Sequence, residues 1–215
     1  MHLSAEDTDL ARLIALLHDI GRFEQLKRYD SFEPGTMDHA AYGVKVLFDE
    51  GMIRRFLPDD KWDSIIYTAI AHHSDYELPE ISDPQTLLHA KLIRDEDKLD
   101  NCRVKLVDST STFINVSEEE LGTQNITQKV YETVFENKCI LSADRVTQMD
   151  YWVSYIVYFF DINFKESFDI IAENDYLNRI IDRISYSNPV TKEQMENIRV
   201  YMQNFINSHT NSQSF

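Results

Sequence analysis

The chain has 215 residues, of which 43% are hydrophobic and 27% are charged, so it is long enough to bury one substantial core. Lys and Arg total 21 against 37 Asp and Glu, which gives a formal net charge of −16. A surface this acidic repels the phosphates of long nucleic acids and the anionic face of a membrane. We therefore expect neither as a partner. A small phosphorylated molecule stays eligible, because a bound dication and a few local basic residues can reverse the potential inside one cleft.

We expect no export or anchoring signal in this chain. No segment approaches the roughly 18 consecutive apolar residues needed to span a bilayer. The first 20 residues also lack the basic segment followed by an apolar segment that is typical of a signal peptide. Cys102 and Cys139 show no CxxC spacing, which favours reduced thiols over a disulfide framework. We expect a soluble, cytoplasmic protein.

Helical periodicity dominates the chain, and only five Gly and five Pro interrupt it; no run alternates with period two. The first helix is predicted from a cap at Ser4 to about Ile20, ended by Gly21, with an irregular stretch over 23–37. A second should begin at Asp38 and end before Gly51. Further helices are expected from about 58–60 to 73, from 82–84 past Asp97, and at about 117–122, 126–137, 142–160, 164–186 and 191–207. The fold class is therefore all-α, a helical bundle or orthogonal array forming a single domain over 1–215.

Six metal-capable side chains stand in a fixed order in the first half of the chain. Imidazole and carboxylate suit a borderline or hard divalent cation, and no Cys lies among them. Five of the seven histidines fall within the first 73 residues, so a shared site is a better explanation than chance. The set is His18, Asp19, His39, His72, His73 and Asp97. His89, by contrast, is predicted to be a packing or surface residue.

The spacing of these residues suggests how they would share one or two cations. A mononuclear hydrolytic site needs about three protein ligands and an open position for water, and a dinuclear site needs a bridging carboxylate. Asp19 is the natural bridge between a first cation on His18 and Asp97 and a second on His39, His72 and His73. Because adjacent helical residues point about 100° apart, His72 and His73 converge only where the helix ends. Ser74 and Asp75 indicate such an end.

Two segments carry a resemblance to a known family. The string Leu16-Leu17-His18-Asp19-Ile20-Gly21-Arg22 resembles the signature of the HD-domain metal-dependent phosphohydrolases, and Arg94-Asp95-Glu96-Asp97-Lys98-Leu99-Asp100 resembles their distal segment, in which Asp97 occupies the ligand position. Asp38-His39 and Ala71-His72-His73 resemble the extra histidines of dinuclear members. The likeness covers about residues 1–105 and leaves out the later helices, about 117–207. The sequences of residues 21–25 and 159–164 further resemble those of one uncharacterised bacterial branch of this family.

The resemblance implies an HD-type helical fold that binds one or two divalent cations. Mn, Fe, Mg, Co, Ni and Zn are all compatible with these ligands. It also implies hydrolysis of a small phosphorylated molecule, such as a nucleotide, by metal-activated water. Arg22 matches a position that often holds a basic residue facing the substrate, and a guanidinium suits two-point contact with phosphate. Lys98 is a second candidate for supporting the phosphate. Asp95 and Asp100 are candidates for accepting hydrogen bonds from ligating imidazoles.

The chain departs from the family pattern at one ligand. The family's first His lies on a helix well before the His-Asp pair, whereas only seventeen residues precede His18. His2 should lie in a loop ahead of the first helix rather than at that position. We expect either that the natural polypeptide begins upstream of Met1 or that the first cation lacks this ligand. In the second case His39, His72 and His73 would form the stronger site.

Two alternatives to a phosphohydrolase stay open. The same ligand set can hold a diiron centre that activates dioxygen, as some HD-domain members do. A non-catalytic metal-binding sensor or assembly module is the other alternative, and the missing first ligand favours it. The sequence is also compatible with a homo-oligomer.

Overall fold

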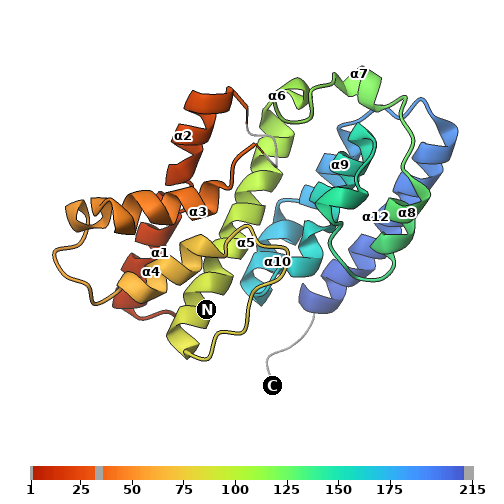
Figure 1. Cartoon of the computed structure of the whole chain (residues 1–215). Helices are drawn as coiled ribbons and strands as arrows, with labels where there is room; N and C mark the ends of the chain where they lie inside the picture. The colour runs from red at the N-terminus through yellow and green to blue at the C-terminus, as the bar shows by residue number, and fades with distance from the viewer. Residues whose placement is uncertain (1, 32–35, 211–215) are drawn as a thin grey trace. The chain divides into compact units, whose positions relative to one another are not determined.

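The computed structural model describes residues 2–31 and 36–210, and all regular structure within these ranges is helical (Figure 1). This confirms the all-α prediction. The backbone divides into two compact units, Met1–Asp97 and Lys98–Phe215, and the boundary falls inside helix α5, Pro84–Val107. Each unit has its own hydrophobic core. The expectation of one domain over 1–215 stays a prediction.

Across the described residues, no helix combines the length and the apolar character that crossing a membrane requires.

The first unit is built from short helices that pack around a small aliphatic core. Helix α3 contacts both α2 and α4, and α1 contacts α4 (Figure 1). Leu47, Ile66 and Ile70 are fully buried in this core. The elements are α1, Ala5–Leu17; α2, Ile20–Tyr29; α3, His39–Val44, continued by a π-helical turn, Lys45–Asp49; a 3-10 turn, Met52–Arg55; α4, Asp63–Ala71; and the first part of α5.

Both helix starts predicted from capping residues in this unit are confirmed. The Ser4 hydroxyl accepts from the backbone N–H of Asp7 at 3.0 Å, and the Asp38 carboxylate accepts from the N–H of Ala41 at 2.9 Å. Each satisfies one of the amides that lack an intrahelical partner at a helix start.

The prediction for residues 20–37 was wrong in part. Gly21 does not end a helix but lies buried in the first turn of α2, and residues 23–29, expected to be irregular, are helical. Asp30 ends this helix in the left-handed conformation, with a φ of 47°. Short polar side chains reach that region more easily than others. Residues 32–35 lie outside the described part of the chain.

Asp7 and His89 form a buried pair beneath the start of α1. Nε2 of His89 lies 3.2 Å from Oδ1 of Asp7, and His89 is 1% exposed. Hydrogen bonds from Ser4, Gln85 and His89 lower the pKa of Asp7 to about 2. His89 is therefore a packing residue, as predicted.

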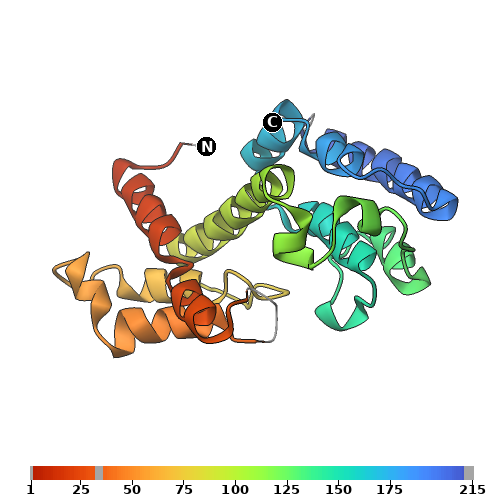
Figure 2. The same ribbon diagram turned by 90° about the horizontal axis from the view of Figure 1, so that it is seen from above.

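The second unit surrounds a larger core centred on Trp152, which is fully buried. Helices α10 and α11 both contact α12, and all three appear in blue shades in Figure 2. The described elements after α5 are α6, Thr110–Ile114; α7, Glu118–Leu121; α8, Gln128–Val134; a 3-10 turn, Ser142–Asp144; α9, Gln148–Ile156, with a 3-10 extension, Val157–Asp161; α10, Lys165–Glu173; α11, Tyr176–Asp182; and α12, Pro189–Thr210.

Three details of this unit differ from the sequence expectation. Helix α6 was not predicted, and the helix expected over 142–160 begins later and tightens at its end. The helix expected over 164–186 is two helices, because Asp175 adopts a φ of 51° between them. Periodicity continues across this break, so the hydrophobic pattern alone does not reveal it.

Two ion pairs in the second unit differ sharply in burial. Nζ of Lys98 lies 2.7 Å from the carboxylate of Asp161, and the Lys98 side chain is only 9% exposed. Lys165 pairs with Asp169 at 2.8 Å one helical turn away, and its side chain is 42% exposed.

Candidate metal centre

The His-Asp pair occupies a break between two helices. Helix α1 ends at Leu17 and α2 begins at Ile20, so His18 and Asp19 form the short turn between them. The backbone N–H of His18 still donates to the carbonyl of Ile14 at 2.8 Å. The prediction that this pair emerges beside the core at a break was correct, although the break comes before Gly21.

The Asp19 carboxylate is the centre of the cluster. Nε2 of His39 lies 3.3 Å and Nε2 of His73 lies 3.6 Å from Oδ1 of Asp19. The two Nε2 atoms are 3.0 Å apart. Oδ1 is buried and has no hydrogen-bond partner, although the Asp19 side chain as a whole is 44% exposed. One carboxylate oxygen thus faces inward onto two imidazoles while the group stays open to solvent.

His18 links this centre to the distal acidic residue. Its Nε2 lies 3.7 Å from Oδ2 of Asp19 and 3.9 Å from Oδ1 of Asp97 in α5. Ligand atoms of His18, Asp19 and His73 all lie within 4.8 Å of one another. The structure therefore brings together five of the six predicted ligands: His18, Asp19, His39, His73 and Asp97.

Backbone carbonyls orient two of the imidazoles. Nδ1 of His18 lies 2.9 Å from the carbonyl of Ala15, and Nδ1 of His73 lies 2.7 Å from the carbonyl of Ile70. A carbonyl only accepts, so Nδ1 carries a proton in both rings and Nε2 is the ring nitrogen that faces the cluster. Metal-ligating histidines are held in this way.

The local electrostatics keep the centre anionic. Burial raises the pKa of the Asp19 carboxyl, but the imidazoles of His39 and His73 and the nearby His18 and Arg22 outweigh it and hold the pKa well below its usual range. Burial also lowers the pKa of His39. Asp19 is ionised and His39 is neutral at pH 7, which are the protonation states that metal ligands require.

These observations fit a divalent cation. The buried oxygen of Asp19 makes no hydrogen bond, and the guanidinium of Arg22 at 3.4 Å approaches it from the edge of the cluster; a cation among the imidazoles would add to this compensation of its charge. The imidazole nitrogens around it are the donor type that Mn, Fe, Co, Ni and Zn share with carboxylate oxygen. His18, Asp19 and His73 would hold such an ion, with His39 and Asp97 beside them.

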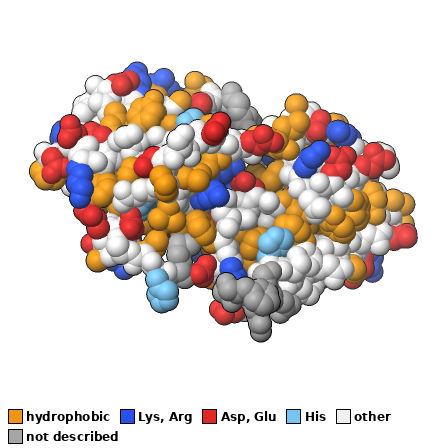
Figure 3. Space-filling model, turned by 90° about the horizontal axis from the view of Figure 1, so that it is seen from below, with side chains coloured by type: hydrophobic (Ala, Val, Ile, Leu, Met, Phe, Trp, Pro, Cys, Tyr) orange, Lys and Arg blue, Asp and Glu red, His pale blue; other side chains and the backbone are white. Residues whose placement is uncertain are grey.

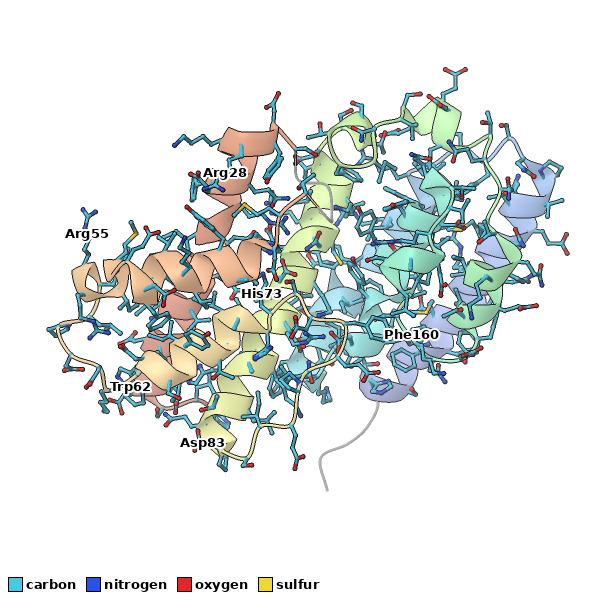
Figure 4. All side chains as sticks on the ribbon, in the orientation of Figure 1. Arg28, Arg55, Trp62, His73, Asp83 and Phe160 are labelled. Carbon is cyan, nitrogen blue, oxygen red and sulfur yellow. The ribbon has the colours of Figure 1, made fainter. Side chains whose placement is uncertain are left out.

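His72 follows a different path from its neighbour. Helix α4 covers Asp63–Ala71, a shorter span than the predicted 58–60 to 73. Nε2 of His73, which Figure 4 labels, lies 3.6 Å from Oδ1 of Asp19. His72 is about one third exposed, and its Nδ1 lies 2.6 Å from the carboxylate of Asp75. Its role as a ligand of a second cation stays a prediction.

Arg22 lies at the edge of the cluster in a fixed orientation. Its Nε is 3.4 Å from Oδ1 of Asp19, and its Nη1 donates to the side-chain carbonyl of Gln25 at 2.9 Å. Gln25 is fully buried and donates in turn to the hydroxyl of Thr36 at 2.8 Å. Gln25 was not predicted as a site residue. The available signal was its place one helical turn after Arg22.

The other predicted site residues have separate surroundings. Lys98 pairs with Asp161, and Asp100 is exposed and accepts from Arg103 at 2.8 Å. Asp95 is buried within α5. The roles assigned to these three residues stay predictions. His2 is exposed ahead of α1, as expected for a loop.

Comparison with known proteins agrees with this geometry. A scan against protein-family models matches residues 1–102 to the HD domain, which is the family that the motifs resemble. Searches of curated proteins and of solved structures found no significant match. The matched segment contains all six predicted ligands, and five of them converge in the structure. Residues 1–102 of this chain are therefore similar to the HD domain in both sequence motifs and arrangement of donors.

Proposed function

We propose that this protein is a metal-dependent phosphohydrolase that acts on a small phosphorylated molecule such as a nucleotide. The observation that carries the proposal is the inward oxygen of Asp19, buried and without a hydrogen-bond partner, with the Nε2 atoms of His39 and His73 facing it. HD domains are mostly metal-dependent hydrolases, which supports the same reaction class.

A divalent cation at this centre would lower the pKa of a bound water and neutralise charge on the phosphoryl oxygens. The residues of the chain supply the rest. Asp19 remains ionised because its pKa is depressed, and His18 and His73 present Nε2 because their Nδ1 protons are engaged by backbone carbonyls. Asp97 adds a second carboxylate from α5.

Arg22 is suited to bind the phosphate group. Gln25 and Asp19 hold its guanidinium beside the cluster, and its side chain is 31% exposed, so an anionic ligand at the cluster can contact it from solvent. A guanidinium contacts two phosphate oxygens at once and stays charged throughout the pH range of activity. In a chain with a net charge of −16, this local positive charge favours a small anionic substrate over a long polynucleotide. On the face drawn in Figure 3, Lys and Arg side chains are scattered among acidic and neutral ones.

The test combines metal analysis with a phosphatase panel. The purified protein is loaded separately with Mn²⁺, Co²⁺, Mg²⁺ and Fe²⁺, and phosphate release is measured from nucleoside phosphates and sugar phosphates. We expect one metal to support hydrolysis in the wild-type protein and in Asp9→Asn, whose carboxylate is exposed on α1. We expect Asp19→Asn, which keeps the shape of the side chain but removes its charge, to lose both bound metal and activity.

The two alternative activities give different results in the same experiment. Oxygen consumption by an iron-loaded protein that releases no phosphate would identify an oxygenase. Metal binding without turnover of any substrate in the panel would identify a sensor or assembly module. Hydrolysis that survives Asp19→Asn would contradict the proposal.

A further inference from the structure

A buried guanidinium supports the turn that carries His73. Arg94, in α5, is 2% exposed. Its Nη1 donates to the backbone carbonyl of His72 at 2.9 Å and to that of Asp75 at 2.8 Å, and the carbonyl of His73 lies 3.4 Å away. One guanidinium nitrogen thus faces three carbonyls of a single tight turn.

The chain needs such a donor at this position. The last carbonyls of an α-helix lack intrahelical partners, and α4 ends at Ala71 before the chain reverses through 72–75. A turn of this kind would leave several carbonyls unsatisfied next to a buried site. A guanidinium carries five donors in a rigid plane, so it can serve several acceptors together.

The same turn determines where His73 points. Its Nδ1 donates to the carbonyl of Ile70, and its Nε2 lies 3.6 Å from Asp19. Figure 4 labels His73 at the end of α4. Arg94 lies three residues before Asp97, on neighbouring positions of α5. Helix α5 therefore supplies both Asp97 to the cluster and the Arg94 guanidinium that binds the turn carrying His73.

We propose that Arg94 is a positioning residue for the metal centre. By holding the carbonyls of the turn 72–75, it fixes the backbone of His73 and directs Nε2 of this imidazole at Asp19. The inference rests on the proposed function for its consequence in metal binding. The orientation of the His73 ring, however, is a property of the metal-free protein and can be measured separately.

The experiment compares Arg94→Met and Arg94→Lys with Arg103→Met. Arg103 lies on the same helix, but it is exposed and pairs with Asp100, so its replacement controls for loss of a guanidinium from α5. Long-range proton–nitrogen NMR of the metal-free proteins reports which ring nitrogen of His73 carries the proton. A titration with Mn²⁺ alone reports affinity.

We expect the wild-type protein and Arg103→Met to show the Nδ1-protonated form of His73 as a single sharp species. Arg94→Met should show exchange between ring forms and should bind Mn²⁺ about 10–100-fold more weakly, the usual range for loss of a residue that orients a ligand. Arg94→Lys keeps a positive charge on a shorter stem with fewer donors, so its His73 signal and its affinity should fall between those of wild type and Arg94→Met.

A folded Arg94→Met protein with the wild-type His73 signal and unchanged Mn²⁺ affinity would overturn the inference, because Arg94 would then only stabilise the fold. If Arg94→Met does not fold, Arg94→Lys decides the question, and equality with Arg103→Met in both measurements would overturn it. If the wild-type protein binds none of Mn²⁺, Co²⁺, Mg²⁺ and Fe²⁺, the proposed function fails, and the His73 NMR signal alone then tests the role of Arg94.

Discussion

Replacing Gly21 by Ala should disrupt the contact on which the metal centre is built. A Cβ placed on Gly21 would lie 2.0 Å from the backbone carbonyl oxygen of His39 and 2.9 Å from the backbone nitrogen of Gly43. Both obstacles are backbone atoms of α3, so no side chain can rotate to relieve the clash. Because His39 faces Asp19, any shift of α3 away from α2 also widens the centre.

The magnitude follows from the required movement. An ordinary contact begins at 3.4 Å, so the two backbones must separate by 3.4 − 2.0, or about 1.4 Å. Overpacking of this kind costs about 1–3 kcal/mol, and a rigid obstacle puts the cost near the upper end. The higher helix propensity of Ala offsets at most about 1 kcal/mol of that. We therefore expect a net loss of about 2 kcal/mol, or about 4–8 °C in the midpoint of thermal unfolding.

Gly43→Ala provides the matched control. The nearest atoms to a Cβ at that position lie 3.5 Å or more away, so Ala fits and should leave the midpoint unchanged or slightly raised. The assay is thermal unfolding of both variants, followed by a Mn²⁺ titration, in which only Gly21→Ala should bind more weakly. Equal midpoints and equal affinities for the two variants would refute the argument from close packing of α2 on α3.

Three further predictions concern residues outside the centre. Lys98→Met should lower the free energy of unfolding by about 2 kcal/mol because it removes a charged hydrogen bond made by a largely buried ammonium group, whereas Lys165→Met should cost less than about 0.5 kcal/mol; equal losses in urea would contradict the difference in burial of the two lysines. Asp7→Asn should lower the unfolding midpoint near neutral pH, and the difference should vanish as the pH falls from 3.8 to about 2, because the folded-state pKa of Asp7 is lowered to about 2. Burial raises the pKa of Cys102 to about 12, so the native chain should react with a disulfide reagent through Cys139 alone, and a Cys139→Ser chain that still reacts quickly would disprove this.

The sequence predicted well those features that depend on local chemistry. The caps at Ser4 and Asp38 were predictable because a Ser or Asp residue just before a helical pattern of apolar residues is typical of a helix N-cap. The left-handed residues Asp30 and Asp175 were not, because many Asp residues occur in the chain and only tertiary packing selects which of them breaks a helix. Gly21 misled for a related reason. A glycine after a helical period usually ends the helix, but here its missing side chain permits two helices to touch.

The candidate centre was predictable as a set of donors but not as a geometry. The order of His and Asp residues identified the candidate ligands, since a shared metal site explains such a set better than chance does. Gln25 and Arg94 lie within segments that resemble the family, but the order of donors assigns them no role, because neither is a ligand and each acts on a neighbour through one or a few hydrogen bonds. Such supporting contacts depend on which helices pack against each other, and the hydrophobic periodicity of one sequence does not predict these helix pairs.

His72 and His73 show how two adjacent and chemically identical residues acquire different surroundings. At the end of α4 a rotation of about 100° separates their side chains, so only one can face Asp19 unless the backbone also turns. Arg94 holds the carbonyls of both residues, and Asp75 holds the ring of His72 through Nδ1. The two imidazoles are thus held by different carboxylates: His73 faces Asp19, whereas His72 pairs with Asp75 at a more exposed position.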